Sequence, residues 1–134
     1  MSKEIVHVSG KRKSAIARAT LRPGKGVIRV NGVLLDVYQP KIARLKVREP
    51  LMLADEISGK VDIDVIVNGG GIMSGADAAR LAVARALVEY DGKAALREKF
   101  LNYDRSLLVA DVRYKETCKP NDSKARAKRQ KSYR

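Results

Sequence analysis

The last 22 residues of the chain place the strongest limit on what it can fold into. Residues 113–134 contain nine basic and two acidic side chains, one proline and few apolar side chains. Such a segment cannot bury enough apolar surface to offset the conformational entropy that folding removes. We therefore expect one globular domain over residues 1–112, followed by an extended basic C-terminal tail over residues 113–134. The 16 residues from Lys119 to Arg134 would span roughly 50 Å if fully extended.

Positive charge is concentrated at the two ends of the chain. The net charge is +13 over 134 residues; residues 1–30 hold eight basic side chains and one acidic one, whereas residues 31–112 hold eleven basic and twelve acidic ones. A near-neutral body with basic ends is typical of proteins that bind nucleic acid or another polyanion. A solvated end that only aids solubility is the simpler interpretation of the tail, and the charge pattern leaves it open.

The composition disfavours export and membrane insertion. No apolar run approaches the roughly 18 residues of a spanning helix, and the start Met1-Ser2-Lys3-Glu4 lacks the apolar core of a signal peptide. The basic segments carry no bulky apolar stripe of the kind that binds a membrane surface. A single cysteine, Cys118, cannot form a disulfide framework. We expect a cytoplasmic protein with no membrane partner.

Apolar patterns in the first quarter of the chain predict strands. Residues 5–8 form a short apolar run that leads into the basic cluster at residues 10–13. Over residues 14–22 small apolar side chains occupy every second position, which predicts a strand with one cationic face. Residues 27–30 are predicted to form the return strand of a β-hairpin with residues 14–22, and the Asn31-Gly32 pair predicts another tight turn. The apolar face of the first of these two strands consists of Ala15, Ala17, Ala19 and Leu21.

The rest of the body is predicted to combine helices with further strands. Residues 38–58 mix prolines with helical spacing, which predicts two short helices, and residues 61–67 are β-branched and alternate like a strand. Ser74 is a candidate N-cap for a helix that continues to Tyr90, and a second helix is predicted over residues 94–103. Residues 107–112 are predicted to form the last strand. The fold class is therefore α+β, with a sheet of about four strands packed with three or four helices.

Patterns that would indicate catalysis or metal binding are weak. Gly69-Gly70-Gly71 is similar to a dinucleotide-binding loop, but Ser74 stands at the third glycine position; we interpret these glycines as a turn that lets a helix start close to the sheet. Asp62 and Asp64 share one strand face and are a candidate cation site, although a solvated or arginine-paired face is the alternative that we favour. His7 and Cys118 lack companions that would complete a catalytic or metal site. We expect no enzyme activity, no cofactor and no metal.

The aromatic residues indicate which kind of nucleic acid the chain binds. The sequence has no Trp, and none of its six Tyr and Phe residues lies between Lys11 and Arg29. A sheet that stacks unpaired bases needs aromatic platforms. We therefore expect the N-terminal cations to bind folded RNA or DNA through phosphate groups. These cations are Lys11, Arg12, Lys13, Arg18, Arg22 and Arg29.

Four segments in a fixed order carry a family resemblance. They are GKRKSAIAR at residues 10–18, the Asn31-Gly32 turn, the segment from Gly69 to Leu87, and DRSLL at residues 104–108 with Asp111 and Arg113. Together they resemble the family of small-subunit ribosomal protein nine, and the C-terminal QKSYR is similar to its archaeal and eukaryotic branch. The resemblance covers nearly the whole chain, and the combination is far more specific than any single motif.

The resemblance implies a ribosomal protein of the head of the small subunit. Its partners would be small-subunit ribosomal RNA, neighbouring head proteins and the transfer RNA at the peptidyl site, which the C-terminal arm would approach through the RNA. The implied fold is similar to the second domain of small-subunit ribosomal protein five, with a left-handed β-α-β crossover where the general rule favours a right-handed one. The arm would add Lys124, Arg126 and Lys128 to the ribosomal-RNA-binding residues, and Arg129, Lys131, Tyr133 and Arg134 would contact transfer RNA.

Two other classes of function stay open. A stand-alone nucleic-acid chaperone or nucleoid-type binder fits the charge equally well, but it would not need this particular C-terminal sequence. The other class is an enzyme that acts on a phosphorylated substrate. Changes at residues 69–71 would abolish the turnover of such an enzyme.

Overall fold

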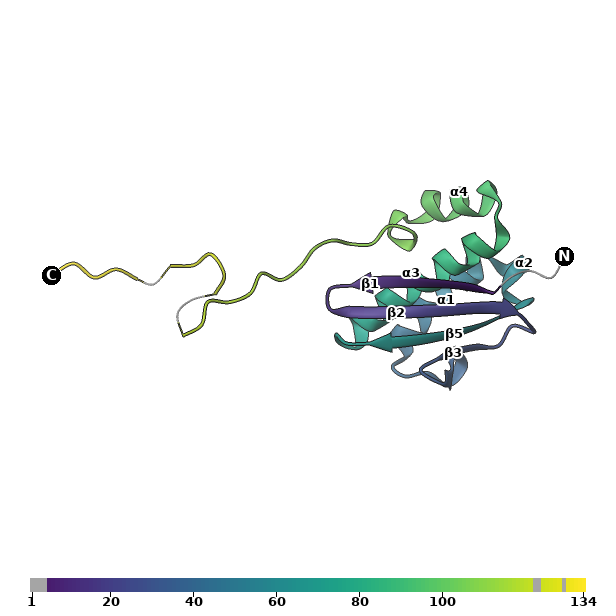
Figure 1. Cartoon of the computed structure of the whole chain (residues 1–134), viewed down its shortest axis with the longest axis horizontal. Helices are drawn as coiled ribbons and strands as arrows, with labels where there is room; N and C mark the ends of the chain where they lie inside the picture. The colour runs from purple at the N-terminus through teal and green to yellow at the C-terminus, as the bar shows by residue number, and fades with distance from the viewer. Residues whose placement is uncertain (1–4, 122–123, 129) are drawn as a thin grey trace.

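One mixed sheet of five strands forms a layer of the molecule (Figure 1). The computed structural model describes residues 5–121, 124–128 and 130–134. The strands lie in the order β1-β2-β5-β3-β4, and all neighbours are antiparallel except β3 and β5, which run parallel. Their bounds are β1 (Val6–Arg12), β2 (Ala15–Pro23), β3 (Ile28–Val30), β4 (Val33–Leu34) and β5 (Val61–Asn68). The predicted α+β class is confirmed, with a fifth strand, the two-residue β4, that the sequence pattern did not indicate.

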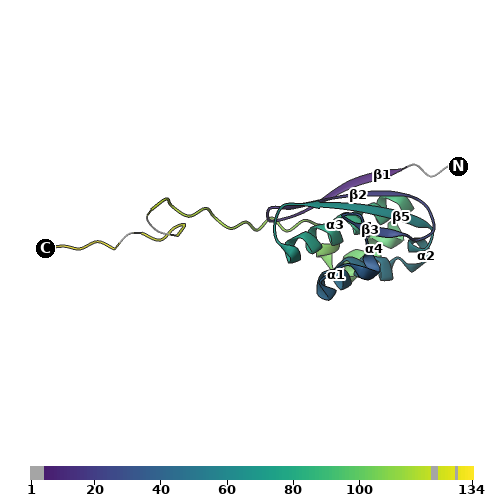
Figure 2. The ribbon, with the colours of Figure 1, turned by 90° about the horizontal axis from the view of Figure 1, so that it is seen from below.

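Helices cover one face of this sheet and leave the other uncovered in the described residues (Figure 2). The long helix α3 lies across β1 and β2 and packs against α1. The helices are α1 (Lys41–Leu53), α2 (Asp55–Ser58), α3 (Ile72–Asp91) and α4 (Ala94–Tyr103), with short 3-10 turns η1 (Leu35–Val37) and η2 (Arg105–Leu107). None of the helices described is long and apolar enough to cross a membrane.

The core lies between the sheet and α3 and is built largely from small side chains. The alternation predicted for residues 14–22 is confirmed, since the four residues of the predicted apolar face of β2 are fully buried, whereas Ile16 between them is exposed. α3 contributes Ala78, Ala79 and Ala82 to the same contact, and all three are also fully buried. Alanine and glycine allow a helix to approach a strand closely, so the sheet and α3 form one tightly packed unit.

The predicted hairpin between residues 14–22 and 27–30 is wrong. β2 forms its hairpin with β1 through Lys13 and Ser14, and β5 lies between β2 and β3. The chain after β2 does not turn straight back, because Asp62 of β5 accepts hydrogen bonds from the backbone N–H groups of Lys25 and Val27, at 2.9 and 2.8 Å, and holds this loop open. The tight turn predicted at Asn31-Gly32 is confirmed between β3 and β4, with φ angles of 50° and 80°.

The predicted strand at residues 107–112 is also wrong. Leu107 ends the turn η2 with its side chain fully buried, and the following residues have no regular structure. The side chain of Arg85 explains this: it donates hydrogen bonds to the carbonyl oxygens of Leu108, at 3.0 Å, and of Ser9 in β1, at 2.9 Å. These carbonyl groups are therefore bridged by a guanidinium group rather than by a strand ladder.

The helix predictions hold in outline. Residues 94–103 form α4 as predicted, and residues 38–58 contain two helices, although they meet at Ala54 and Pro50 lies within α1. Ser74 is not the N-cap of α3: the cap is Gly71, and the Ser74 hydroxyl accepts a hydrogen bond from the Gly71 N–H and donates one to the Gly71 carbonyl.

Candidate nucleic-acid interface

The uncovered face of the sheet carries four of the cations predicted to bind RNA. Strand alternation places Lys11 of β1, Arg18 and Arg22 of β2, and Arg29 of β3 on this face, and all four are exposed. The opposite face of the same strands packs on the helices. The fold therefore gathers cations from three strands on one surface.

Arg22 and Arg29 share a single carboxylate on this face. Arg22 donates a hydrogen bond to Asp64 of β5, and Arg29 Nη1 lies 3.7 Å from Asp64 Oδ1. Both arginine side chains stay about half exposed, at 52% and 48%. One carboxylate cannot neutralise two guanidinium groups, so the group keeps a net positive charge and presents planar donors to solvent, an arrangement suited to phosphate.

The other acid of β5 has a structural role. Asp62 accepts the two backbone hydrogen bonds described above, from Val27 and Lys25, and these bonds hold the pKa of its carboxyl below the ordinary value. The arginine-paired interpretation of this strand face is thus confirmed for Asp64, whereas Asp62 binds backbone. In the part of the chain that the structure describes, no group of three His, Cys, Asp or Glu side chains could hold a metal ion.

Of the six N-terminal cations predicted to bind RNA, Arg18 and Lys13 are the most available to a ligand. Both are exposed, and neither forms an ion pair within the described residues. Arg18 lies opposite Ile66 of β5, whose side chain is 57% exposed. Lys13 lies at the tip of the β1-β2 hairpin with a φ of 53°.

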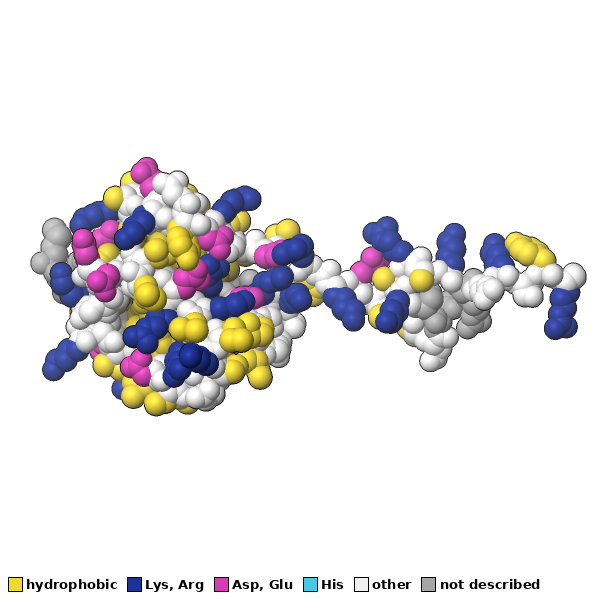
Figure 3. All heavy atoms as spheres, turned by 180° about the vertical axis from the view of Figure 1, so that it is seen from behind, with side chains coloured by type: hydrophobic (Ala, Val, Ile, Leu, Met, Phe, Trp, Pro, Cys, Tyr) yellow, Lys and Arg dark blue, Asp and Glu magenta, His cyan; other side chains and the backbone are white. Residues whose placement is uncertain are grey.

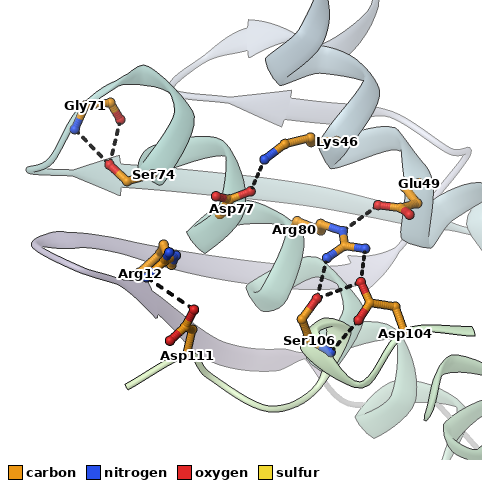
Figure 4. Close-up of polar contacts among 10 residues, drawn as sticks. All are labelled: Arg12, Lys46, Glu49, Gly71, Ser74, Asp77, Arg80, Asp104, Ser106 and Asp111. Atoms are coloured by element: carbon orange, nitrogen blue, oxygen red, sulfur yellow. Dashed lines mark hydrogen bonds and ion pairs between the residues drawn. The ribbon is translucent and has the colours of Figure 1, made fainter. Parts of the chain in front are cut away.

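Arg12 is placed differently from its two neighbours. It lies on the helix side of the sheet, where its Nη1 atom is buried and 3.4 Å from Asp111 Oδ2 (Figure 4). The Nζ atom of Lys11 lies 5.4 Å from the centre of the Tyr114 ring. Arg12 therefore contacts the last residues before the C-terminal tail, and Lys11 contacts the beginning of the tail itself.

Arg80 and Arg85 of α3 have roles that sequence reasoning missed. Arg80 donates hydrogen bonds to Asp104 and Ser106, both at 2.9 Å, and to Glu49 of α1, so it joins α3, α1 and η2 (Figure 4). Burial alone would lower the pKa of Arg80, but the bonds to Glu49 and Asp104 raise it. Hydrogen bonds from Ser106, and next from Arg80, lower the pKa of Asp104 to about 2. Two arginines within a largely buried helix are the signal that could have revealed these contacts.

The basic residues of the tail are exposed along its length. Figure 3 shows the tail extending from the body with Lys and Arg side chains along it. Arg126 pairs with Glu116 at 3.1 Å, and Tyr133 is 87% exposed. Arg129 lies outside the described residues. The other predicted arm residues, Lys124, Lys128, Lys131 and Arg134, are all exposed.

The glycine-rich turn is confirmed as a structural feature. Gly69 and Gly70 have φ angles of 73° and 66°, and their backbone lies close to Ser14 and Ala15 of the hairpin. A Cβ at Gly69 would lie 2.8 Å from the Ser14 carbonyl oxygen. The turn therefore brings the start of α3 against the β1-β2 hairpin.

Comparison with known proteins agrees with this architecture. A family model described as ribosomal protein S9/S16 matches residues 10–134. The small ribosomal subunit protein uS9 of Methanothrix thermoacetophila is 53% identical over 131 residues, which cover 98% of this chain and 99% of that protein. Proteins of the same name from Methanococcus maripaludis and Methanococcus vannielii are each 51% identical over 133 residues, again covering 98% of this chain and 99% of theirs.

The match spans both the sheet with its helices and the basic tail, and it confirms the family resemblance of the sequence segments. The chain therefore belongs to the ribosomal protein S9/S16 family and is a structural protein of the small ribosomal subunit that serves translation and is not an enzyme.

Proposed function

We propose that the uncovered face of the sheet binds small-subunit ribosomal RNA through phosphate groups, and that the C-terminal arm reaches the transfer RNA at the peptidyl site. One observation carries the first part: the uncovered face holds exposed Arg18, and its Arg22 and Arg29 share one carboxylate. Neutralising phosphates with such cations releases counterions, which drives binding. Because the five described strands contribute no Tyr, Phe or Trp side chain to this face, it reads the shape of folded RNA rather than unpaired bases.

In this proposal the chain works as two parts with different tasks. Residues 1–112 form the body that docks on RNA, together with neighbouring head proteins, and residues 113–134 form the arm. The arm is ordered by its phosphate contacts, which offset the entropy lost on ordering. Lys124, Arg126 and Lys128 bind ribosomal RNA along its path, and Arg129, Lys131, Tyr133 and Arg134 at its end support the transfer RNA.

Two finer expectations accompany this function. The location is the ribosome, which we place in the cytoplasm. The likeness of the body to the second domain of small-subunit ribosomal protein five, with its left-handed crossover, stays a prediction; the described crossover joins the parallel strands β3 and β5 through α1 and α2.

A salt titration with a matched pair of variants tests the RNA-binding face. Arg18→Gln removes a cation from the uncovered face. Arg97→Gln removes another exposed cation, from α4, for which the structure records no ion pair within the described residues. We expect Arg18→Gln to weaken binding to a small-subunit RNA fragment and to reduce the slope of log affinity against log salt by about one. Equal effects of the two variants would contradict the assignment of this face.

Deleting residues 129–134 tests the role of the arm. We expect subunits that incorporate the shortened protein at near-normal levels but bind transfer RNA more weakly at the peptidyl site. Unchanged affinity would contradict the arm's role. A stand-alone chaperone or nucleoid-type binder predicts instead that the tagged chain does not co-purify with small subunits.

A further inference from the structure

Three arginines of the body contact the segment from which the arm leaves. Arg80 binds Asp104, Arg85 binds the carbonyl of Leu108, and Arg12 lies beside Asp111. These contacts recur every three or four residues along the segment, which also inserts the fully buried side chain of Leu107 into the core. The chain up to Asp111 is therefore attached to the body along its length.

The attachment ends abruptly after Asp111. The side chain of Asp111 is 25% exposed, whereas the next residue, Val112, is 89% exposed. Asp111 is held from two sides: Arg113 of the arm donates hydrogen bonds to it at 2.6 and 2.9 Å, and Arg12 of the β1-β2 hairpin lies 3.4 Å away. Asp111 is thus the last docked residue of the body segment, and it links Arg12 of the body to Arg113, the first cation of the arm.

Arg12 is poorly placed to bind a phosphate. Its side chain is only 20% exposed, and its Nη1 atom is buried with no hydrogen-bond partner among the described residues. Among the described residues Arg12 pairs with Asp111, in the segment that leads into the arm, so a phosphate would have to compete with this carboxylate for the guanidinium group. The adjacent Lys11 also faces the arm, because its ammonium group lies over the Tyr114 ring.

From this geometry we propose that Arg12 is a positioning residue which, through Asp111, sets the direction in which the C-terminal arm leaves the body. This inference builds on the arm's role in the proposed function and gives Arg12 a different task from Lys13 in the same run of basic residues. Fixing the root of a flexible segment raises the effective concentration of its far end at one place, so the arm's end meets the transfer RNA more often. Hydrogen bonds from Arg113, with a smaller contribution from the charge of Arg12, hold the pKa of Asp111 well below its ordinary value, so the carboxylate stays charged at neutral pH.

The single cysteine of the chain allows a direct test in the free full-length protein. Cys118 is exposed in the arm, seven residues beyond Asp111, and accepts a nitroxide label without further substitution. In the wild-type protein we expect the label to broaden the amide NMR signals at the tip of the β1-β2 hairpin more than elsewhere on the body. Arg12→Gln and Asp111→Asn should spread this broadening over a wider surface, whereas Arg12→Lys, which keeps the charge at Asp111, and Lys13→Gln should leave it in place.

Transfer-RNA binding by reconstituted subunits gives a second, sign-sensitive test. Asp111→Asn removes one negative charge from the chain, so phosphate attraction alone predicts tighter binding, whereas loss of the arm's direction predicts binding weaker by on the order of threefold. Arg97→Gln, which removes an exposed cation from α4, should leave peptidyl-site affinity unchanged. A label pattern in Arg12→Gln identical to that of the wild type, or equal or tighter transfer-RNA binding by Asp111→Asn, would overturn the inference. Because the label experiment uses the free protein, it stands even if deleting residues 129–134 disproves the arm's contact with transfer RNA.

Discussion

Gly10 of β1 lies directly against the backbone of Ala78 in α3, so closely that a Cβ atom on Gly10 would be 2.4 Å from the Ala78 carbonyl oxygen. The Ala82 amide nitrogen would be only 2.7 Å away. Neither neighbour is a flexible side chain, so the helix or the strand would have to move. This contact packs the β1-β2 hairpin, which carries Lys11, Arg12 and Lys13, directly against α3.

The first prediction follows from that contact. Gly10→Ala should lower the free energy of unfolding by about 2–3 kcal/mol, because the added methyl group overpacks a fixed backbone contact. Gly59→Ala is the matched control: nothing lies within 4 Å of its Cβ position, and its φ of −75° suits alanine. Urea unfolding monitored by circular dichroism measures both. A Gly10→Ala variant as stable as Gly59→Ala would refute the close approach.

Arg80 is predicted to stabilise the body rather than to bind RNA. Arg80→Ala leaves Glu49 and Asp104 without their guanidinium partner and should cost about 2 kcal/mol of unfolding free energy. Arg97→Ala, at an exposed site on α4, should change it by less than about 0.5 kcal/mol. Denaturant titration of both variants makes the comparison, and equal stabilities would contradict the role assigned to Arg80.

Asp104 should make stability depend on pH in the acid range. Its pKa is about 2 in the folded protein against an ordinary 3.8, so its stabilising contribution is fully present above pH about 4 and disappears as the pH falls toward 2. The contribution should not exceed about 1 kcal/mol, because the side chain is 40% exposed. Asp104→Asn should therefore be less stable than the wild type at pH 6 and approach it near pH 2. A difference that does not change with pH would mean that the ionised form is not what stabilises the fold.

Asp64 is predicted to limit the affinity of the uncovered face for RNA. Asp64→Asn frees Arg22 and Arg29 from their shared carboxylate, so RNA binding should become tighter and the salt dependence steeper, with the slope changing by up to about one. Asp55→Asn makes the same change of charge on α2, on the helix side, and should have a smaller effect. If both variants tighten binding equally, net charge alone would explain the result.

Local sequence patterns predicted the helices and strands well, but they did not predict which strands pair with one another. The alternation over residues 14–22 and the helix over residues 94–103 depend on neighbours in sequence, and both are present. The strand partner of β2 depends on β5, which begins at Val61, and no short pattern indicates that β5 inserts between β2 and β3. A β-hairpin with the next strand was therefore the wrong prediction.

The residues of the candidate site also fall into those that local patterns predict and those that depend on long-range contacts. Strand alternation alone places Arg18 and Arg22 on one face, and the structure agrees; the pairing of β3 with β5 then adds Arg29 to the same face. Arg12 is another of the N-terminal cations, but its environment is set by Asp111, which is distant in the sequence. Arg80 likewise donates a hydrogen bond to Asp104, which lies 24 residues further along the chain. Contacts of this kind depend on how α3 packs against the sheet, which composition and spacing do not describe.

The central claim is that the end of the arm touches transfer RNA at the peptidyl site, and site-specific cross-linking tests it most directly. A photoreactive phenylalanine analogue placed at Tyr133 of the full-length chain would be incorporated into small subunits and irradiated with and without transfer RNA at that site. The account predicts a cross-link to the anticodon stem-loop that requires bound transfer RNA. Cross-links confined to ribosomal RNA or to proteins, unchanged by the presence of transfer RNA, would contradict it.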